Sequence, residues 1–141
     1  MVRARAGWLT TLMLASMAAC AGPNLWTDGT SISTGTTSRG RMRKPAKLPL
    51  TGPGFVVPPR WEERGFQYGV DELVGAVQRA AKKVGGRAKR GLLGVADFGP
   101  QRGGKSAWHG SHQSGRDVDL HFYSVDVKGH PIDAPHHDMI R

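Results

Sequence analysis

Glycine and proline interrupt this chain so often that they argue against a long-helix or coiled-coil protein. The 141 residues include 20 glycines and 9 prolines, and both residue types are unfavourable in the interior of a helix or strand. A chain of this length has room for one modest domain, since a domain takes roughly 100 to 200 residues. The sequence therefore predicts a single small domain of short elements.

The first 19 residues are typical of an export signal. Two arginines precede an apolar run at residues 8–19, which is shorter than the roughly 20 residues that a transmembrane helix needs. The lone Cys20 follows a Met-Ala-Ala string that resembles the lipobox of bacterial lipoproteins. We expect residues 1–19 to be a signal peptide, Cys20 to be the lipid attachment site, and the protein to be a periplasmic lipoprotein anchored to the outer or inner membrane. An ordinary secretory signal and a buried N-terminal helix are the alternatives.

Residues 20–40 are rich in glycine, serine and threonine, a composition that buries too little apolar surface to order itself independently. We expect a flexible, lipid-anchored tether there, followed by a domain over residues 41–141. Without the signal and its two arginines the chain keeps 122 residues and a formal charge of +7 instead of +9. A basic run around the junction indicates either a solvated surface or attraction to an anionic one; it comprises Arg39, Arg41, Arg43, Lys44 and Lys47.

The clearest helix begins near Asp71, and its apolar residues recur at helical spacing as far as Val84. We expect Gly85-Gly86 to end it. Residues 55–57, which lie between prolines, predict a short edge strand, and residues 92–98 predict a buried strand. Together these elements predict an α+β domain with a small antiparallel sheet and at least one packed helix.

Residues 117–123 alternate polar and apolar side chains, which indicates a strand with one polar and one apolar face. Gly115 lets the preceding loop fold back, so that His112 can approach Asp119. An imidazole and a carboxylate together make half of a plausible zinc site, and a chain with one cysteine must hold any metal with such groups. The apolar face, which we expect to be buried, comprises Val118, Leu120 and Phe122.

The string from His109 to Asp119, His-Gly-Ser-His-Gln-Ser-Gly-Arg-Asp-Val-Asp, resembles the penicillin-insensitive murein endopeptidases, members of the LAS group of zinc peptidases that share a His-x6-Asp element. The resemblance implies an LAS-type metallopeptidase fold with His112 and Asp119 as ligands of a catalytic zinc ion. His109 matches a position that the family assigns to a second metal ion or to the substrate site, so the resemblance implies one or two zinc ions. Asp117 and His121, on the polar face of the predicted strand, are expected to support the site.

The resemblance covers roughly residues 30–126 and implies a periplasmic zinc endopeptidase. Such an enzyme hydrolyses the D-alanyl-meso-diaminopimelyl cross-links of peptidoglycan, with zinc polarising the scissile carbonyl and activating a water. The basic mature chain suits an anionic wall polymer as its partner. Three loop cations either grip substrate carboxylates or are solvated, and the residues alone leave both readings open; these are Arg102, Lys105 and Arg116.

The sequence departs from the family pattern after Asp119. The family takes its third zinc ligand and a catalytic histidine from a downstream His-x-His element, and no such element occurs in this sequence. His130 and the adjacent pair His136-His137 are expected to be surface histidines. We therefore expect a domain that is incomplete at its C-terminus and inactive as given, and we assign no catalytic residue.

Two further functions fit parts of the sequence. One is a catalytically dead, wall-associated protein or a peptidoglycan-binding fragment without a complete metal site, which would bind zinc weakly because it offers fewer ligands. The other is nucleic-acid binding through the basic outer face of the predicted helix. A solvated face is the commoner explanation of such charges, and the export signal conflicts with a nucleic-acid partner, so we expect none.

Overall fold

A computed structural model describes residues 29–88 and 91–132 of the chain. The predicted signal peptide, Cys20 and the pair His136-His137 lie outside these residues. Within the described ranges, no helix is long and apolar enough to cross a membrane. In chain order the elements are β1 (Ile32–Thr36), β2 (Arg39–Arg43), β3 (Ala46–Lys47), β4 (Thr51–Gly52), β5 (Phe55–Val56), α1 (Pro59–Arg64), β6 (Tyr68–Gly69), α2 (Asp71–Ala88), β7 (Leu93–Gly94), β8 (Ser124–Val125) and β9 (Pro131–Ile132).

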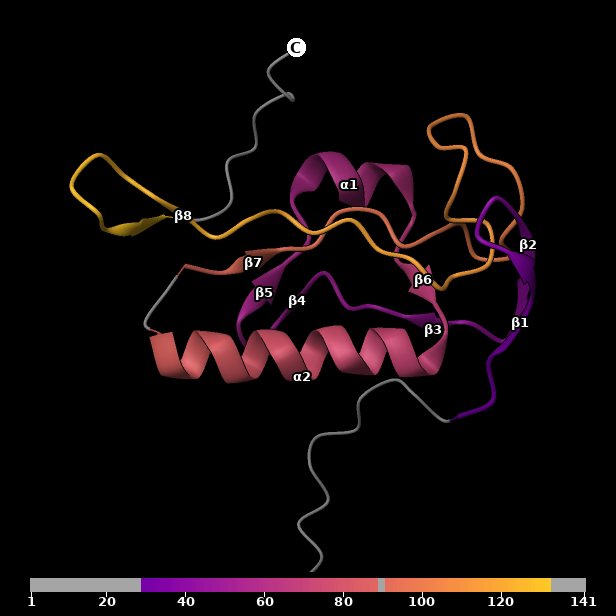
Figure 1. Ribbon diagram of the computed structural model, residues 1–141, viewed down its shortest axis with the longest axis horizontal. Helices are drawn as coiled ribbons and strands as arrows, with labels where there is room; N and C mark the ends of the chain where they lie inside the picture. The colour runs from indigo at the N-terminus through magenta and orange to yellow at the C-terminus, as the bar shows by residue number, and fades with distance from the viewer. Residues whose placement is uncertain (1–28, 89–90, 133–141) are drawn as a thin grey trace, which may run out of the picture.

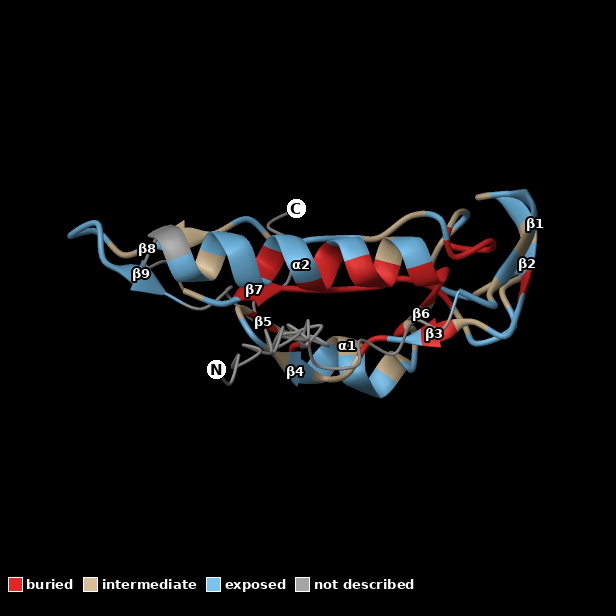
Figure 2. Ribbon diagram, turned by 90° about the horizontal axis from the view of Figure 1, so that it is seen from below, coloured by how far each residue is buried: buried red, intermediate tan, exposed pale blue. Residues whose placement is uncertain are grey.

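The strands β5 and β7 lie between the two helices, with α2 on one side and α1 on the other (Figures 1 and 2). A three-stranded sheet has the order β4-β5-β7, in which β4 and β5 are antiparallel and β5 and β7 are parallel. The predicted α+β class with small antiparallel sheets and a packed helix is confirmed, although the β5–β7 pairing is parallel. The prediction of an edge strand at residues 55–57 is wrong, since β5 pairs on both sides. The flanking prolines lie just outside the paired residues, so they remove no ladder hydrogen bond.

The core lies between α2 and the strands, and it is built from aliphatic side chains and two phenylalanines. Burying each of the valine, leucine and phenylalanine side chains contributes roughly 1.5–3 kcal/mol relative to leaving it exposed. Trp61 of α1 packs against the same cluster. The buried members are Ala46, Leu48, Phe55, Val57, Val74, Val77, Ala81, Leu93, Val95 and Phe98.

The helix α2 runs through the two glycines that were expected to end it. It extends from Asp71 to Ala88, so the predicted stop at Gly85-Gly86 is wrong. Gly54, in the β4–β5 turn, has a φ of +87°, and a Cβ there would overlap the carbonyl oxygen of Ala81. A Cβ at Gly85 would lie 3.2 Å from the Cα of Gly54. Gly54 and Gly85 therefore allow the turn and the helix to approach closely. This packing offsets the low helix propensity of Gly85.

Residues 32–43 form an antiparallel hairpin, β1–β2, so the prediction of a flexible tether is wrong for residues 32–40. The hairpin depends on the rest of the domain. The Ser33 hydroxyl donates to the carbonyl of Ser114 (2.9 Å), and the backbone N–H of Met42 donates to the carbonyl of Arg102 (3.0 Å). Composition shows that this segment cannot order itself alone, whereas the order here comes from contacts with residues far along the chain.

Residues 117–123 run beside the strand region that begins at β7, but their apolar face is largely uncovered. Val95 and Leu120 form an antiparallel bridge, and Val118 packs against the core. Leu120 is 46% exposed and Phe122 is 91% exposed, so the prediction that both are buried is wrong. Alternation decides which side chains share a face, and it does not supply an element to cover that face. No element of the described chain buries these two side chains.

The β8–β9 hairpin closes through Asp126. Its carboxylate accepts the backbone N–H groups of Lys128 and His130, each at 2.8 Å. The backbone hydrogen bond from His130 is the main cause that lowers the pKa of Asp126 below its ordinary value. The His130 ring lies 3.1 Å from the same carboxylate and is exposed, as expected for a surface histidine.

Candidate functional site

Asp119 is held beside Ala96 and Asp97 by a pair of backbone hydrogen bonds. The N–H of Ala96 donates to the carbonyl of Asp119, and the N–H of Asp119 donates to the carbonyl of Asp97, each at 2.9 Å. Between these two segments the chain makes a long loop over residues 99–116. The loop brings His109 and His112 back to the segment that ends at Asp97. His109 then lies beside Asp97, and His112 lies beside Asp119.

His112 is buried and its ring is oriented by the backbone. Its φ of +63° is in the left-handed region, which is uncommon for a residue other than glycine. The backbone N–H of His112 donates to Asp117 Oδ2 (2.9 Å), in keeping with the supporting role expected of Asp117. Nδ1 lies 2.7 Å from the carbonyl oxygen of Phe98. Because a carbonyl only accepts, Nδ1 carries a proton, and in the neutral ring Nε2 is then the acceptor.

The free Nε2 of His112 faces the carboxylate of Asp119, with 3.3 Å between Nε2 and Oδ2. Two acceptors at this distance need a proton or a cation between them. Two ligand atoms on one tetrahedral zinc ion, each about 2.1 Å from the metal, lie roughly 3.4 Å apart. The nitrogen and oxygen donors, their spacing and the backbone partner of Nδ1 therefore fit a zinc ion.

His109 lies next to this pair and is held by a different carboxylate. Its ring centroid is 4.7 Å from that of His112, and Nε2 is 2.7 Å from Asp97 Oδ2. His109, His112 and Asp119 each offer a ligand atom, and the three atoms lie within 4.8 Å of one another. The structure therefore brings together the three residues that the sequence singled out. His121, by contrast, packs edge-on against the Trp61 ring, with centroids 4.5 Å apart.

Asp97 is a partner of the site that the sequence pattern did not reveal. Its side chain is fully buried, and Oδ2 accepts a hydrogen bond from Arg64 Nη1 (2.6 Å) as well as lying against His109. The Arg64 guanidinium in turn stacks over the Trp108 ring, 4.7 Å from its centroid. A carboxylate at the end of the apolar run 92–98 was the available signal, because a buried carboxylate requires a cationic or hydrogen-bonding partner.

The turn between His112 and Asp119 depends on Gly115, as the sequence predicted. Gly115 has a φ of +67°, and a Cβ there would overlap the sulfur of Met42. Gly115→Ala is expected to lower the free energy of unfolding by roughly 2–4 kcal/mol, from left-handed strain together with the clash. Urea denaturation followed by circular dichroism measures the loss.

Gly65→Ala is the matched control for this prediction. Gly65 ends α1 with a φ of +70°, and a Cβ there meets no atom within 4 Å. Only strain applies, so a loss of roughly 1 kcal/mol is expected. Equal losses in the two variants would contradict the packing role given to Gly115.

Residues 33–138 match the family described as penicillin-insensitive murein endopeptidase. The chain belongs to this family. The match spans the loop with both histidines and the segment with Asp119, so the resemblance noted from the sequence is confirmed.

Two relatives of the murein endopeptidase family come from Klebsiella pneumoniae, and both are named penicillin-insensitive murein endopeptidase. The protein of subspecies pneumoniae, strain ATCC 700721 / MGH 78578, is 34% identical over 93 residues, which cover 65% of this chain and 33% of the relative. The protein of strain 342 is 33% identical over 93 residues, with the same coverage. The aligned region thus spans about a third of the length of these relatives.

Proposed function

We propose that His112 and Asp119 are two ligands of the catalytic zinc ion of a murein endopeptidase, which hydrolyses D-alanyl-meso-diaminopimelyl cross-links in peptidoglycan. The observation that carries the proposal is the grouping of two imidazoles and a carboxylate within 4.8 Å inside the region that matches the family. His112 offers Nε2 and Asp119 offers Oδ2. A catalytic zinc ion usually takes three protein ligands, and we place the third ligand outside the described residues.

The chain's own residues prepare the site for this chemistry. The carbonyl of Phe98 holds the His112 ring in the tautomer whose Nε2 can bind a metal ion. The backbone hydrogen bond between Asp119 and Asp97 fixes the position of Asp119 along the neighbouring segment. Asp97 holds His109, which is left with Nδ1 for a second metal ion or for substrate. A bound zinc ion would supply Lewis-acid polarisation of the scissile carbonyl and a more acidic water.

We further propose that the protein works in the periplasm, where its polymer substrate would be found. The export signal over residues 1–19 and lipid attachment at Cys20 belong to this proposal. The support is the sequence pattern of the first 20 residues together with the family match.

Two measurements on the purified chain test the function. Isothermal titration calorimetry with ZnCl₂ is expected to give one zinc site, or two. Cross-linked muropeptides incubated with the zinc-loaded chain test cleavage, as read by liquid chromatography with mass detection. Uncross-linked products that EDTA suppresses would show a complete catalytic site, against the incomplete ligand set that the sequence predicts. Absence of zinc binding would refute the metal site.

Zinc binding without cleavage favours the second candidate, a wall-associated peptidoglycan-binding protein with an incomplete site. The observation that favours this candidate is that the described residues offer two well-oriented ligands, while His109 is already held by Asp97. Pelleting of the chain with isolated peptidoglycan, in the absence of cleavage, identifies that case.

A further inference from the structure

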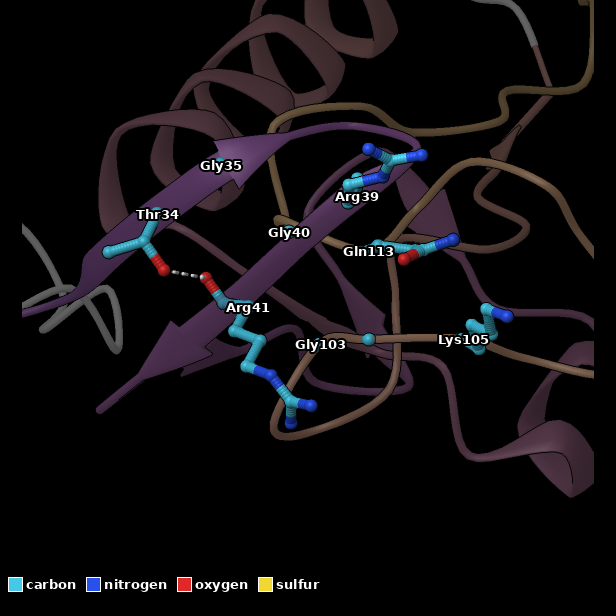
Figure 3. Close-up of a pocket in the computed structure, with 9 residues that line it drawn as sticks. Thr34, Gly35, Arg39, Gly40, Arg41, Gly103, Lys105 and Gln113 are labelled. Atoms are coloured by element: carbon cyan, nitrogen blue, oxygen red, sulfur yellow. Dashed lines mark hydrogen bonds between the residues drawn. The ribbon is translucent and has the colours of Figure 1, made fainter.

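A hollow on the β1–β2 hairpin, separate from the metal cluster, is lined by cations and glycines. Its volume is about 610 Å³. Arg39 and Arg41 come from β2 and Lys105 comes from the loop that precedes His109, and Figure 3 shows the three side chains around Gly103. Within residues 29–88 and 91–132, no acidic residue lines the hollow. The described residues that line it are Thr34, Gly35, Arg39, Gly40, Arg41, Gly103, Gly104, Lys105 and Gln113.

The floor of this hollow consists of backbone that glycine brings together. Gly103 forms a β-bridge with Arg41, and a Cβ on Gly103 would overlap the carbonyl oxygen of Gln113. A Cβ on Gly40 would lie 2.6 Å from the Cβ of Ser114. The glycines have no side chains to occupy the hollow. The space between the cationic side chains therefore stays open.

The cations extend beyond this first hollow. A second, adjoining hollow of about 850 Å³ shares Thr34 and Arg41 with the first. It adds three further cations and, in the part of the chain that the structure describes, no acidic residue; the cations are Arg43, Lys44 and Arg102. The cations of the two hollows repel one another. In the described ranges none of these six side chains forms an ion pair with a carboxylate. Such an arrangement is most stable when an external anion lies against it.

The first hollow adjoins the metal cluster through Gln113. This residue follows His112 in the chain and is buried, with its carbonyl accepting the N–H of Gly104 (3.0 Å). Its side-chain amide donates to the carbonyl of Gly110 (3.2 Å) in the His109–His112 loop. One residue thus touches the loop of the candidate zinc site on one side and the basic hollow on the other.

We propose that the basic hollow binds carboxylates of the peptidoglycan peptide stems and holds the polymer beside the metal cluster. This inference rests on the proposed function and deepens it. Meso-diaminopimelate has two carboxyl groups, so a stem joined through its amino group keeps a free carboxylate close to the scissile amide. Arginine binds carboxylates through paired N–H donors, and lysine adds a point charge. The repeating negative charge of the polymer matches the row of cations.

The test is binding of the chain to isolated peptidoglycan in EDTA, measured by co-sedimentation, so that nothing is cleaved. The triple variant Arg39→Gln, Arg41→Gln, Lys105→Gln is expected to bind at least about tenfold more weakly than the original chain. Peptidoglycan whose carboxyl groups have been converted to methylamides is expected to bind the original chain with a similar loss. This second arm needs no variant and stays valid if the triple variant misfolds.

A matched control removes three charges elsewhere. Arg79→Gln, Lys82→Gln and Lys83→Gln change exposed residues of α2, most of which extends away from the hairpin (Figure 1), and binding within about twofold of the original is expected. An equal loss in both triples would show general charge attraction and overturn the proposal. Unchanged binding to the methylamidated polymer, or displacement by polyphosphate but not by polyglutamate, would also overturn it. Because EDTA is present, these outcomes are independent of zinc binding, and failure of the zinc titration refutes the proposed function alone.

Discussion

Replacing His112 by alanine is expected to lower the affinity of the chain for Zn²⁺ by at least about 100-fold, since even loss of an outer partner of a zinc ligand costs 10–100-fold. Nε2 of His112 and Oδ2 of Asp119 are 3.3 Å apart, and removing either leaves one well-placed donor. Asp119→Ala is therefore expected to have a similar effect and, in an intact enzyme that includes the third ligand, to remove muropeptide cleavage with it. Competition against a chromophoric chelator measures both affinities.

His130→Ala is the control for the zinc measurement. His130 also pairs with an aspartate, but at the exposed β8–β9 turn, and its loss is expected to leave the zinc affinity within about twofold of the original. His112→Ala also removes the hydrogen-bond partner of the Phe98 carbonyl. Circular dichroism is therefore used to check that this variant still folds. A folded His112→Ala protein that binds zinc as tightly as the original would refute the ligand assignment.

Replacing Asp97 by alanine is expected to lower the free energy of unfolding by roughly 3 kcal/mol or more, the cost of removing one partner of a buried ion pair. Asp97 is fully buried, and Arg64 lies 2.6 Å from its Oδ2 with only 14% of its own side chain exposed. Without the carboxylate, the guanidinium loses its buried partner. Urea unfolding measures the loss, and a weaker zinc affinity is expected beside it because His109 loses its anchor.

Two further variants make the Asp97 prediction specific. Asp97→Asn keeps an oxygen acceptor of the same shape and is expected to recover part of the stability, roughly 1 kcal/mol or more. Asp126→Ala removes a carboxylate from the exposed β8–β9 turn, and it is expected to change the free energy of unfolding far less than Asp97→Ala does, because solvent screens an exposed pair. A stability loss at Asp97 no larger than that at Asp126 would contradict the buried pairing.

Local pattern accounts for the elements whose formation depends on neighbours in the chain. The apolar spacing after Asp71 predicted α2 correctly at its start, because helical periodicity is a property of residues three and four apart. The end of α2 was not predictable, since the helix passes so close to Gly54 at Gly85 that a Cβ on Gly85 would lie 3.2 Å from the Cα of Gly54. The β1–β2 hairpin likewise takes its order from partners such as Ser114, 81 residues from Ser33.

The sequence by itself determined the chemical identity of the candidate site, because His112 and Asp119 lie on either side of a glycine turn within one short string. It also determined the family, since that string is local. Only the tertiary structure decided that the Arg64–Asp97 pair holds His109, that Leu120 and Phe122 are exposed, and that Arg39, Arg41 and Lys105 surround one hollow. Each of these depends on packing between segments distant in the chain, and spacing along a sequence carries no information about which segments meet.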